Sequence, residues 1–149
     1  MLLLIRIAPV HRLCKAGYFV PVIVWSILIW SLSTTSEIPH IPFDFLSLDK
    51  LGHLTFYAVE TLLLIWGFAK TQEWVTNKLS WVLICMILAG IYGTSLEFVQ
   101  GGIPERSFDY ADMIANFVGT IIGGLIYYKT ATKYFLYKSS DNFLNEDGN

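Results

Sequence analysis

Apolar residues fall in four long stretches that alternate with shorter polar segments. The stretches cover residues 18–33, 51–69, 79–98 and 112–128, and the first is the shortest. A helix that crosses the hydrocarbon core of a bilayer needs about 17–25 predominantly apolar residues. Short connections make successive spans neighbours. The pattern therefore predicts an all-α protein, a multi-pass transmembrane bundle of four helices.

Basic residues predict the orientation of this bundle. Eight of them lie on one side of the predicted spans: Arg6, Arg12, Lys15, Lys70, Lys78, Lys129, Lys133 and Lys138. The other side has only Lys50 and Arg106. Because short loops rich in Lys and Arg stay in the cytoplasm, both termini are predicted to be cytoplasmic. The loops 34–47 and 101–109 are then predicted to face outward.

The polar ends of the chain flank one predicted domain. Residues 1–17 are predicted to form a cytoplasmic N-terminal segment and residues 18–128 the membrane domain. Residues 129–149 are predicted to form a cytoplasmic tail, and its polar end, 139–149, is predicted to be disordered.

Composition supports the membrane class. The 149 residues are 54% hydrophobic and 15% charged, whereas a soluble domain of this size needs a larger charged shell. The formal net charge of −2 argues against a nucleic-acid partner, whose phosphates require a basic face. The lipid bilayer is therefore the predicted partner. Cys14 and Cys85 show no spacing typical of a disulfide framework or a metal site.

Polar residues gather at the predicted outer ends of the second, third and fourth spans. They are Asp49, Lys50, His53, Glu97, Gln100, Arg106, Ser107, Asp109, Asp112 and Asn116. Spacings of three and four residues place His53, Tyr57 and Glu60 on one helix face, and Asp112, Asn116 and Gly119 on another. In lipid, polar and small stripes turn inward to face one another. The sequence thus predicts that these groups converge.

The free-energy cost of placing these polar groups inside a membrane indicates a functional role. A carboxylate at the centre of a span costs about 2.5–3.5 kcal/mol, and Glu60 lies about 15 Å below Lys50 at about 1.5 Å per residue. Glu60 must therefore be partnered, protonated or facing water. Intramembrane ionisable residues are functional candidates by default. The alternative is that each polar group only bonds to a neighbouring helix and holds the bundle in register.

The residue types suggest separate roles within the predicted site. The candidate catalytic residues are His53, Glu97 and Asp112, whose side chains can act as general acid or base. The candidate ligand-binding residues are Asp49, Lys50, Gln100, Arg106, Asp109 and Asn116. Among these, the two cations suit a phosphate or carboxylate. Gly119 and Gly123 are predicted to form a close helix contact.

Charge balance constrains the predicted cluster further. Five carboxylates, Asp49, Glu60, Glu97, Asp109 and Asp112, outnumber its two cations by three. Such charges cannot all remain unpaired at low dielectric. Either some carboxylates are protonated, His53 is charged, or a cation or cationic ligand is bound. Carboxylates with one histidine suit Mg²⁺, Mn²⁺ or Zn²⁺, yet no pair has a diagnostic spacing, so the sequence assigns no metal ligand and names no cofactor.

Three motifs occur in a specific order along the chain. They are Asp49-Lys50-x-x-His53, Glu97-x-x-Gln100 and Arg106-x-Phe108-Asp109-x-x-Asp112-x-x-x-Asn116-x-x-Gly119. Together they resemble the VanZ-like family of small bacterial integral membrane proteins, over residues 33–128. The resemblance implies a multi-pass protein of the bacterial plasma membrane. The family is named for a member associated with resistance to the glycopeptide antibiotic teicoplanin, and the resemblance implies no established reaction.

Three functions remain open at this point. An enzyme with an outward-facing site would act on a lipid-linked or glycopeptide-related ligand of the cell envelope. A non-catalytic binding or organising protein would use the polar stripes only to shape a groove. A proton or ion pathway would use Glu60 as a buried relay, but it would need polar partners toward the inner side, and the sequence shows none. The oligomeric state is not predicted.

Overall fold

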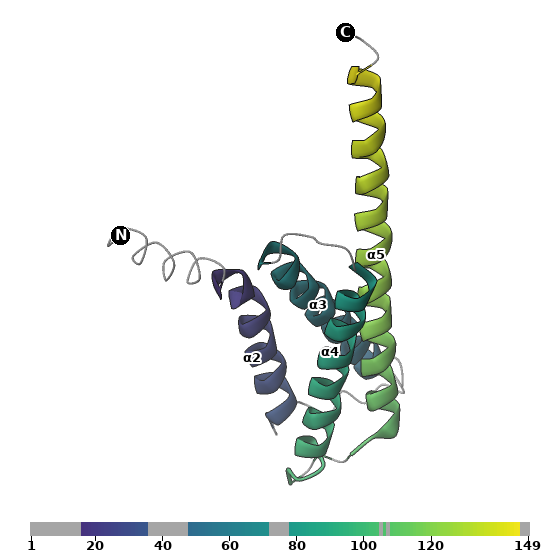
Figure 1. Ribbon diagram of the computed structural model, residues 1–149. Helices are drawn as coiled ribbons and strands as arrows, with labels where there is room; N and C mark the ends of the chain where they lie inside the picture. The colour runs from purple at the N-terminus through teal and green to yellow at the C-terminus, as the bar shows by residue number, and fades with distance from the viewer. Residues whose placement is uncertain (1–15, 36–47, 72–77, 105, 107, 147–149) are drawn as a thin grey trace, which may run out of the picture.

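The computed structural model describes residues 16–35, 48–71, 78–104, 106 and 108–146, with the side chains of 16–35, 49–71, 79–104, 106 and 108–131. Its elements are η1 (Gly17–Phe19), α2 (Val20–Thr34), α3 (Leu48–Thr71), α4 (Lys78–Gln100) and α5 (Tyr110–Glu146). Within these ranges the regular structure is helical throughout, and the helices form a bundle (Figure 1).

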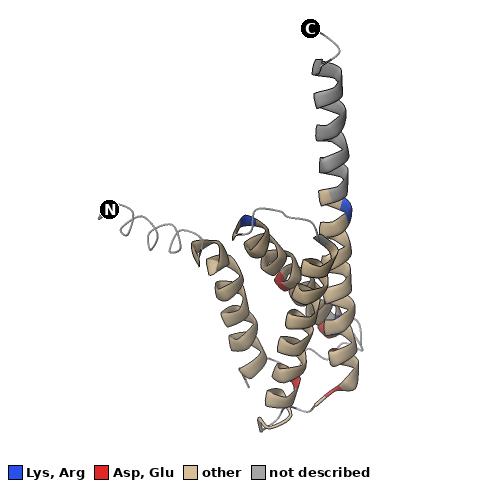
Figure 2. Cartoon of the chain, viewed as in Figure 1, with Lys and Arg blue, Asp and Glu red and all other residues tan. Residues whose placement is uncertain are grey.

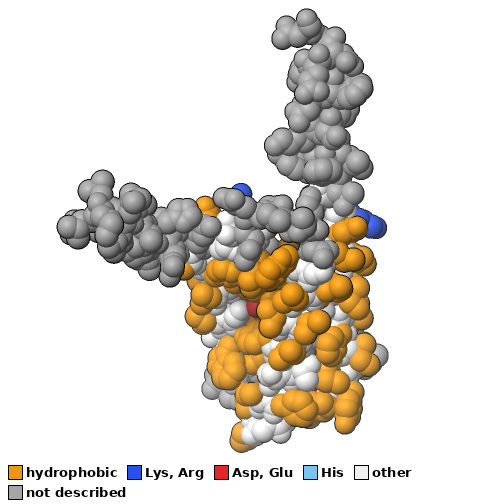
Figure 3. All heavy atoms as spheres, in the orientation of Figure 1, with side chains coloured by type: hydrophobic (Ala, Val, Ile, Leu, Met, Phe, Trp, Pro, Cys, Tyr) orange, Lys and Arg blue, Asp and Glu red, His pale blue; other side chains and the backbone are white. Residues whose placement is uncertain are grey.

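Within the described residues, four helical segments are long and apolar enough to cross a membrane. They are Gly17–Thr34, Asp49–Thr71, Leu79–Gln100 and Tyr110–Ala131. The predicted all-α, four-span architecture is therefore confirmed, with each span a few residues longer than its apolar stretch. Hydrophobic side chains cover much of the outer face of the bundle (Figure 3), and such a surface suits contact with lipid rather than water.

The helix α3 lies against every other helix, and its most extensive contact is with α5. Gly119 and Gly123 of α5 face α3 at this contact. A Cβ on Gly119 would collide with the backbone carbonyl of Leu54, and one on Gly123 with that of Ala58. Because a glycine lets two backbones approach where packing drives association in lipid, α3 and α5 form the closest pair of the bundle.

Two aromatic side chains, one on α2 and one on α4, donate the hydrogen bonds that join α2 to the bundle. Trp25 Nε1 donates to the backbone carbonyl of Phe56 at 3.0 Å, and the Tyr92 hydroxyl donates to that of Ser26 at 2.7 Å. Pro21 lies in the first turn of α2, where the missing N–H costs least. These bonds fix α2 against both α3 and α4.

Two apolar clusters fill the bundle at different depths. Ile29, Tyr57 and Leu96 form one cluster. Ile65, Val82 and Cys85 form the other, farther along α3 and closer to the start of α4. The first cluster supports the polar end of the bundle, and the second closes the opposite half with apolar side chains.

The helix α5 continues to Glu146, well past the predicted end of the fourth span at Tyr128 (Figure 1). The segment from Leu125 to Asp147 contains neither glycine nor proline, so nothing in it breaks a helix locally. The structure thus extends the helix through most of the polar end, 139–149, that the sequence predicts to be disordered.

Charge is distributed unevenly along the bundle. The Lys and Arg residues visible in Figure 2 lie near the end of α3 and beyond the middle of α5, whereas Asp and Glu lie from the opposite end to the middle. Most of the basic residues that predict the orientation, including those of segment 1–17, lie outside the described side chains. The cytoplasmic position of both termini stays a prediction.

Candidate functional site

The predicted polar residues meet at one end of the bundle, where α3 and α5 begin and α4 ends. The helix α3 contributes Asp49, Lys50 and His53, α4 contributes Glu97 and Gln100, the connection contributes Arg106 and Asp109, and α5 contributes Asp112 and Asn116. Glu97 and Asp112 are buried and Asp49 is exposed. The burial of the carboxylates therefore increases from the rim of the site to the interior of the bundle.

Lys50 links the beginnings of α3 and α5. Its Nζ donates to Asp112 Oδ1 at 3.0 Å and to Asp109 Oδ2 at 3.1 Å. The other oxygen of Asp109, Oδ1, accepts the backbone N–H of Ala111 at 2.7 Å and caps α5. That backbone bond, and then the bond from Lys50, lowers the pKa of Asp109 from its ordinary value. Asp109 is thus held in its charged form.

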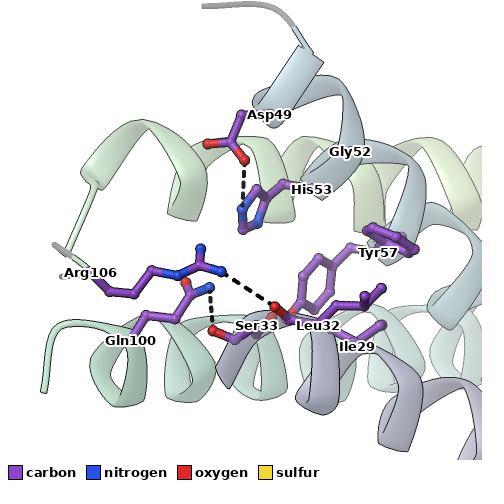
Figure 4. Close-up of a pocket in the computed structure, with 10 residues that line it drawn as sticks. Ile29, Leu32, Ser33, Asp49, Gly52, His53, Tyr57, Gln100 and Arg106 are labelled. Carbon is purple, nitrogen blue, oxygen red and sulfur yellow. Dashed lines mark hydrogen bonds and ion pairs between the residues drawn. The ribbon is translucent and has the colours of Figure 1, made fainter. Parts of the chain in front are cut away.

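His53 lies between three polar side chains of the site. Its Nδ1 is 3.0 Å from Oδ1 of the buried Asn116. Because an amide oxygen only accepts, this contact places a proton on Nδ1. The other nitrogen, Nε2, is 3.9 Å from Asp49 Oδ1 and 3.9 Å from Asp112 Oδ2, beyond the length of a hydrogen bond. Figure 4 shows Asp49 directed toward the ring.

Glu97 is the most enclosed carboxylate of the site, with 1% of its surface exposed. Its Oε1 accepts the backbone N–H of Asp109 at 2.7 Å. Its Oε2 is buried and has no hydrogen-bond partner among the described residues. One oxygen of Glu97 is therefore structural, and the other remains available.

Gln100 and Arg106 connect the site to the end of α2 (Figure 4). Gln100 Nε2 donates to the backbone carbonyl of Ser33 at 3.2 Å. Arg106 Nη2 donates to the carbonyls of Thr35 at 2.8 Å and Leu32 at 3.4 Å. These bonds use one nitrogen of the guanidinium, so the remaining N–H groups have no hydrogen bond to the described part of the chain.

Two concavities adjoin these groups. A pocket of about 150 Å³ is lined by Ile29, Leu32, Ser33, Asp49, Gly52, His53, Phe56, Tyr57, Gln100 and Arg106. An open groove of about 440 Å³ between α3 and α5 is lined by Lys50, Leu51, Leu54, Ala111, Ile114, Ala115 and Val118. Among the described residues that line the groove, Lys50 alone is charged, so a cation lies beside an otherwise apolar surface.

Glu60 does not join the cluster, contrary to the convergence expected from its helix face. Its Oε1 is 2.8 Å from the hydroxyl of Ser26 in α2, and its Oε2 has no hydrogen-bond partner among the described residues. Glu60 lies two turns beyond His53 along α3. At that depth its hydrogen-bond partner is Ser26 of α2. Four carboxylates and two cations therefore remain at the site.

The contribution of α2 to the site is absent from the sequence analysis. It consists of the backbone carbonyls of Leu32, Ser33 and Thr35, together with the apolar side chains of Ile29 and Leu32. Backbone carbonyls carry no residue signature, and α2 has an almost uniformly apolar sequence. The pairing of Arg106 with α2 was therefore not predictable from local pattern.

Three of the converging residues offer a set of metal ligands. Asp49, His53 and Asp112 each present one ligand atom, and these atoms lie within 4.8 Å of one another. The set combines carboxylate oxygen with imidazole nitrogen, and the sequence analysis assigned no ligand there because the spacing is not diagnostic.

Comparison with known proteins gives one family and one curated relative. Residues 14–133 match the family model described as VanZ/LLP1. The uncharacterized protein C11E3.10 of Schizosaccharomyces pombe is 29% identical over 84 residues, which cover 54% of this chain and 49% of that protein. The chain thus spans about half the length of this relative. Because the relative is a fission yeast protein, the expected restriction to bacterial proteins is too narrow. No solved structure matches the chain.

Proposed function

We propose, since this chain belongs to the VanZ/LLP1 family, that its site binds the anionic head group of a lipid-linked ligand and acts on it by proton transfer. The chain is a multi-pass VanZ-like membrane protein. His53, Glu97 and Asp112 are the proposed catalytic residues.

The observation that carries this proposal is the unpartnered oxygen of Glu97. A buried polar atom without a hydrogen bond costs about 1–3 kcal/mol, and a carboxylate inside a membrane span adds a further cost. Glu97 Oε2 has this cost while the Oε1 of the same side chain already caps the backbone. Glu60 also has an oxygen without a partner among the described residues, but Glu97 lies at the polar end of the bundle and bonds Asp109, so its oxygen favours work on a ligand bound there.

The surroundings of Lys50 support a ligand that is part lipid. The groove along α3 and α5 is apolar and open on its outer side, as an acyl or isoprenoid chain requires. Lys50 lies at the junction of this groove with the carboxylates, and Arg106, whose remaining N–H groups have no hydrogen bond to the described residues, lines the pocket beside His53. Two cations in this arrangement suit a phosphate.

The predicted orientation places this site on the outer side of the plasma membrane, where envelope intermediates are exposed. Acting on such an intermediate would alter the envelope that a glycopeptide antibiotic attacks. A contribution to glycopeptide resistance is therefore part of the proposal.

Two buried glutamates provide a matched test. Glu97 and Glu60 both lie in membrane spans, and each has one bonded and one unpartnered oxygen. Glu97→Gln is expected to abolish teicoplanin resistance conferred on a host, and Glu60→Gln to preserve it, at equal abundance in the membrane. Equal resistance in both variants would contradict the catalytic role of Glu97.

Binding is tested separately from catalysis. Lys50→Gln is expected to reduce retention of a polyprenyl monophosphate by the detergent-purified chain, measured by native mass spectrometry, whereas Glu97→Gln should retain it. If Glu97→Gln binds this lipid and also confers full resistance, the site is a binding site without catalysis. The apolar cluster of Ile65, Val82 and Cys85 beyond Glu60 disfavours a continuous proton pathway.

A further inference from the structure

Three ligand-type atoms surround one point at the rim of the site. His53 Nε2 is 3.9 Å from an oxygen of Asp49 and 3.9 Å from an oxygen of Asp112, and one atom from each residue lies within 4.8 Å of the other two. These separations exceed the length of a hydrogen bond. Three donors around one ion with bonds of about 2.0–2.2 Å lie roughly 3–3.8 Å apart, so a bound ion would draw these three side chains closer together.

The orientation of the imidazole is an independent observation. Nδ1 of His53 faces the amide oxygen of Asn116 at 3.0 Å, and Asn116 is 2% exposed. A histidine that binds a metal typically donates its second ring N–H to a carbonyl or carboxylate in this way. Nε2 then faces the two carboxylates, and a cation bound between these three atoms would be stabilised by both negative groups.

The same end of the bundle holds a further buried carboxylate, Glu97. Glu97 is 1% exposed, and its Oε2 has no hydrogen bond among the described residues. Four carboxylates at the site face two cationic side chains, Lys50 and Arg106, so acidic groups are in excess around the three ligand atoms.

We propose that Asp49, His53 and Asp112 bind one divalent transition-metal ion. The mixed oxygen and nitrogen donors fit Mn²⁺ or Zn²⁺, because imidazole suits transition metals and an all-oxygen site suits Mg²⁺ and Ca²⁺. Lys50 does not compete for the same atom, since it bonds Asp112 Oδ1 while Oδ2 faces His53. The inference rests on the proposed function only for the role of the ion, which would hold a phosphate beside Lys50.

The test measures Mn²⁺ binding to the full chain purified in detergent, by electron paramagnetic resonance. One ion per chain is expected, with modulation from an imidazole nitrogen that disappears in His53→Gln. Asp49→Asn is expected to weaken binding on the order of tenfold or more. The side chain of Asp49 is 69% exposed, so this variant leaves the fold intact. Zn²⁺ is expected to displace Mn²⁺ at lower concentration than Mg²⁺ does.

Asp109→Asn is the matched control. It removes a carboxylate of the same cluster that bonds the same Lys50 but is not one of the three ligands, so binding should change by less than about threefold. Equal loss in Asp49→Asn and Asp109→Asn, or no binding by wild type at millimolar Mn²⁺, would overturn the metal site. Retention of polyprenyl monophosphate by the metal-free chain would in that case leave the proposed function standing.

Discussion

The backbone N–H of Asp109 donates a hydrogen bond of 2.7 Å to Oε1 of Glu97 and so joins the start of α5 to the last turn of α4. The bond anchors the connection between these two helices to the side chain of Glu97, which is almost wholly buried. One carboxylate thus has both a structural contact and a free oxygen, and substitutions can separate the two.

Glu97→Leu is expected to lower the free energy of unfolding by about 1–3 kcal/mol, because it leaves the N–H of Asp109 without its acceptor. Glu97→Gln keeps an amide oxygen for that N–H and is expected to be as stable as wild type. Thermal unfolding in detergent measures both. If the two variants were equally destabilised, the contact with Asp109 would not be the structural role of Glu97.

Asp112→Asn is expected to abolish function while membrane insertion and abundance stay unchanged. The asparagine keeps an oxygen for Lys50 Nζ but loses the charge that faces His53. Abundance, thermal stability and teicoplanin resistance are measured side by side. Full activity would remove Asp112 from the proposed catalytic residues, since a purely structural carboxylate in lipid tolerates a neutral isostere.

Gly119→Ala is expected to destabilise the bundle by about 1–3 kcal/mol, because its Cβ meets the backbone of Leu54 and a backbone shifts less easily than a side chain. Gly52→Ala is the control, since nothing lies within 4 Å of its Cβ. It should be neutral or stabilising by up to about 1 kcal/mol.

Larger side chains extend the same test. Leucine at Gly119 or Gly123 should reduce expression far more than leucine at Ala131. Similar expression of the three variants would refute the close contact between α3 and α5.

Acid is expected to weaken the junction of α3 and α5 through Asp109, whose pKa is lowered by the N–H of Ala111 and by Lys50. A lowered folded pKa means that the stabilisation is present above the unfolded pKa of about 3.9 and is lost as the pH falls through the folded value. The unfolding temperature of wild type should therefore approach that of Asp109→Asn below about pH 4. A constant difference between pH 7 and pH 3 would contradict this role.

Cysteine labelling tests the predicted orientation. Position 36 is predicted to be outside and position 77 inside, and both lie outside the described residues. On a background without Cys14 and Cys85, an impermeant thiol reagent on intact cells is expected to label Ser36→Cys and to spare Asn77→Cys. The opposite pattern would mean that the bundle is inverted.

The convergence of the polar residues was predictable because two simple rules act together. Helical spacing fixes which side chains share a face, as for Asp112 and Asn116, and lipid turns polar faces inward. The hydrogen-bond partner of each residue in the site was not predictable, because it depends on how the helices pack against one another. His53 bonds Asn116 and Glu60 bonds Ser26 although His53 and Glu60 were expected on one face. Their burial alone would not have shown that His53 and Glu60 have partners on different helices.

The length of α2 is what the site constrains, more than its sequence. Of its side chains, only Val22 and Ile29 are fully buried. Its hydrogen bonds to Gln100 and Arg106 come from carbonyls that any residue supplies. Substitutions among the exposed apolar residues of α2 should therefore be neutral through evolution, whereas an inserted or deleted residue would rotate these carbonyls by about 100° and detach the helix from the site.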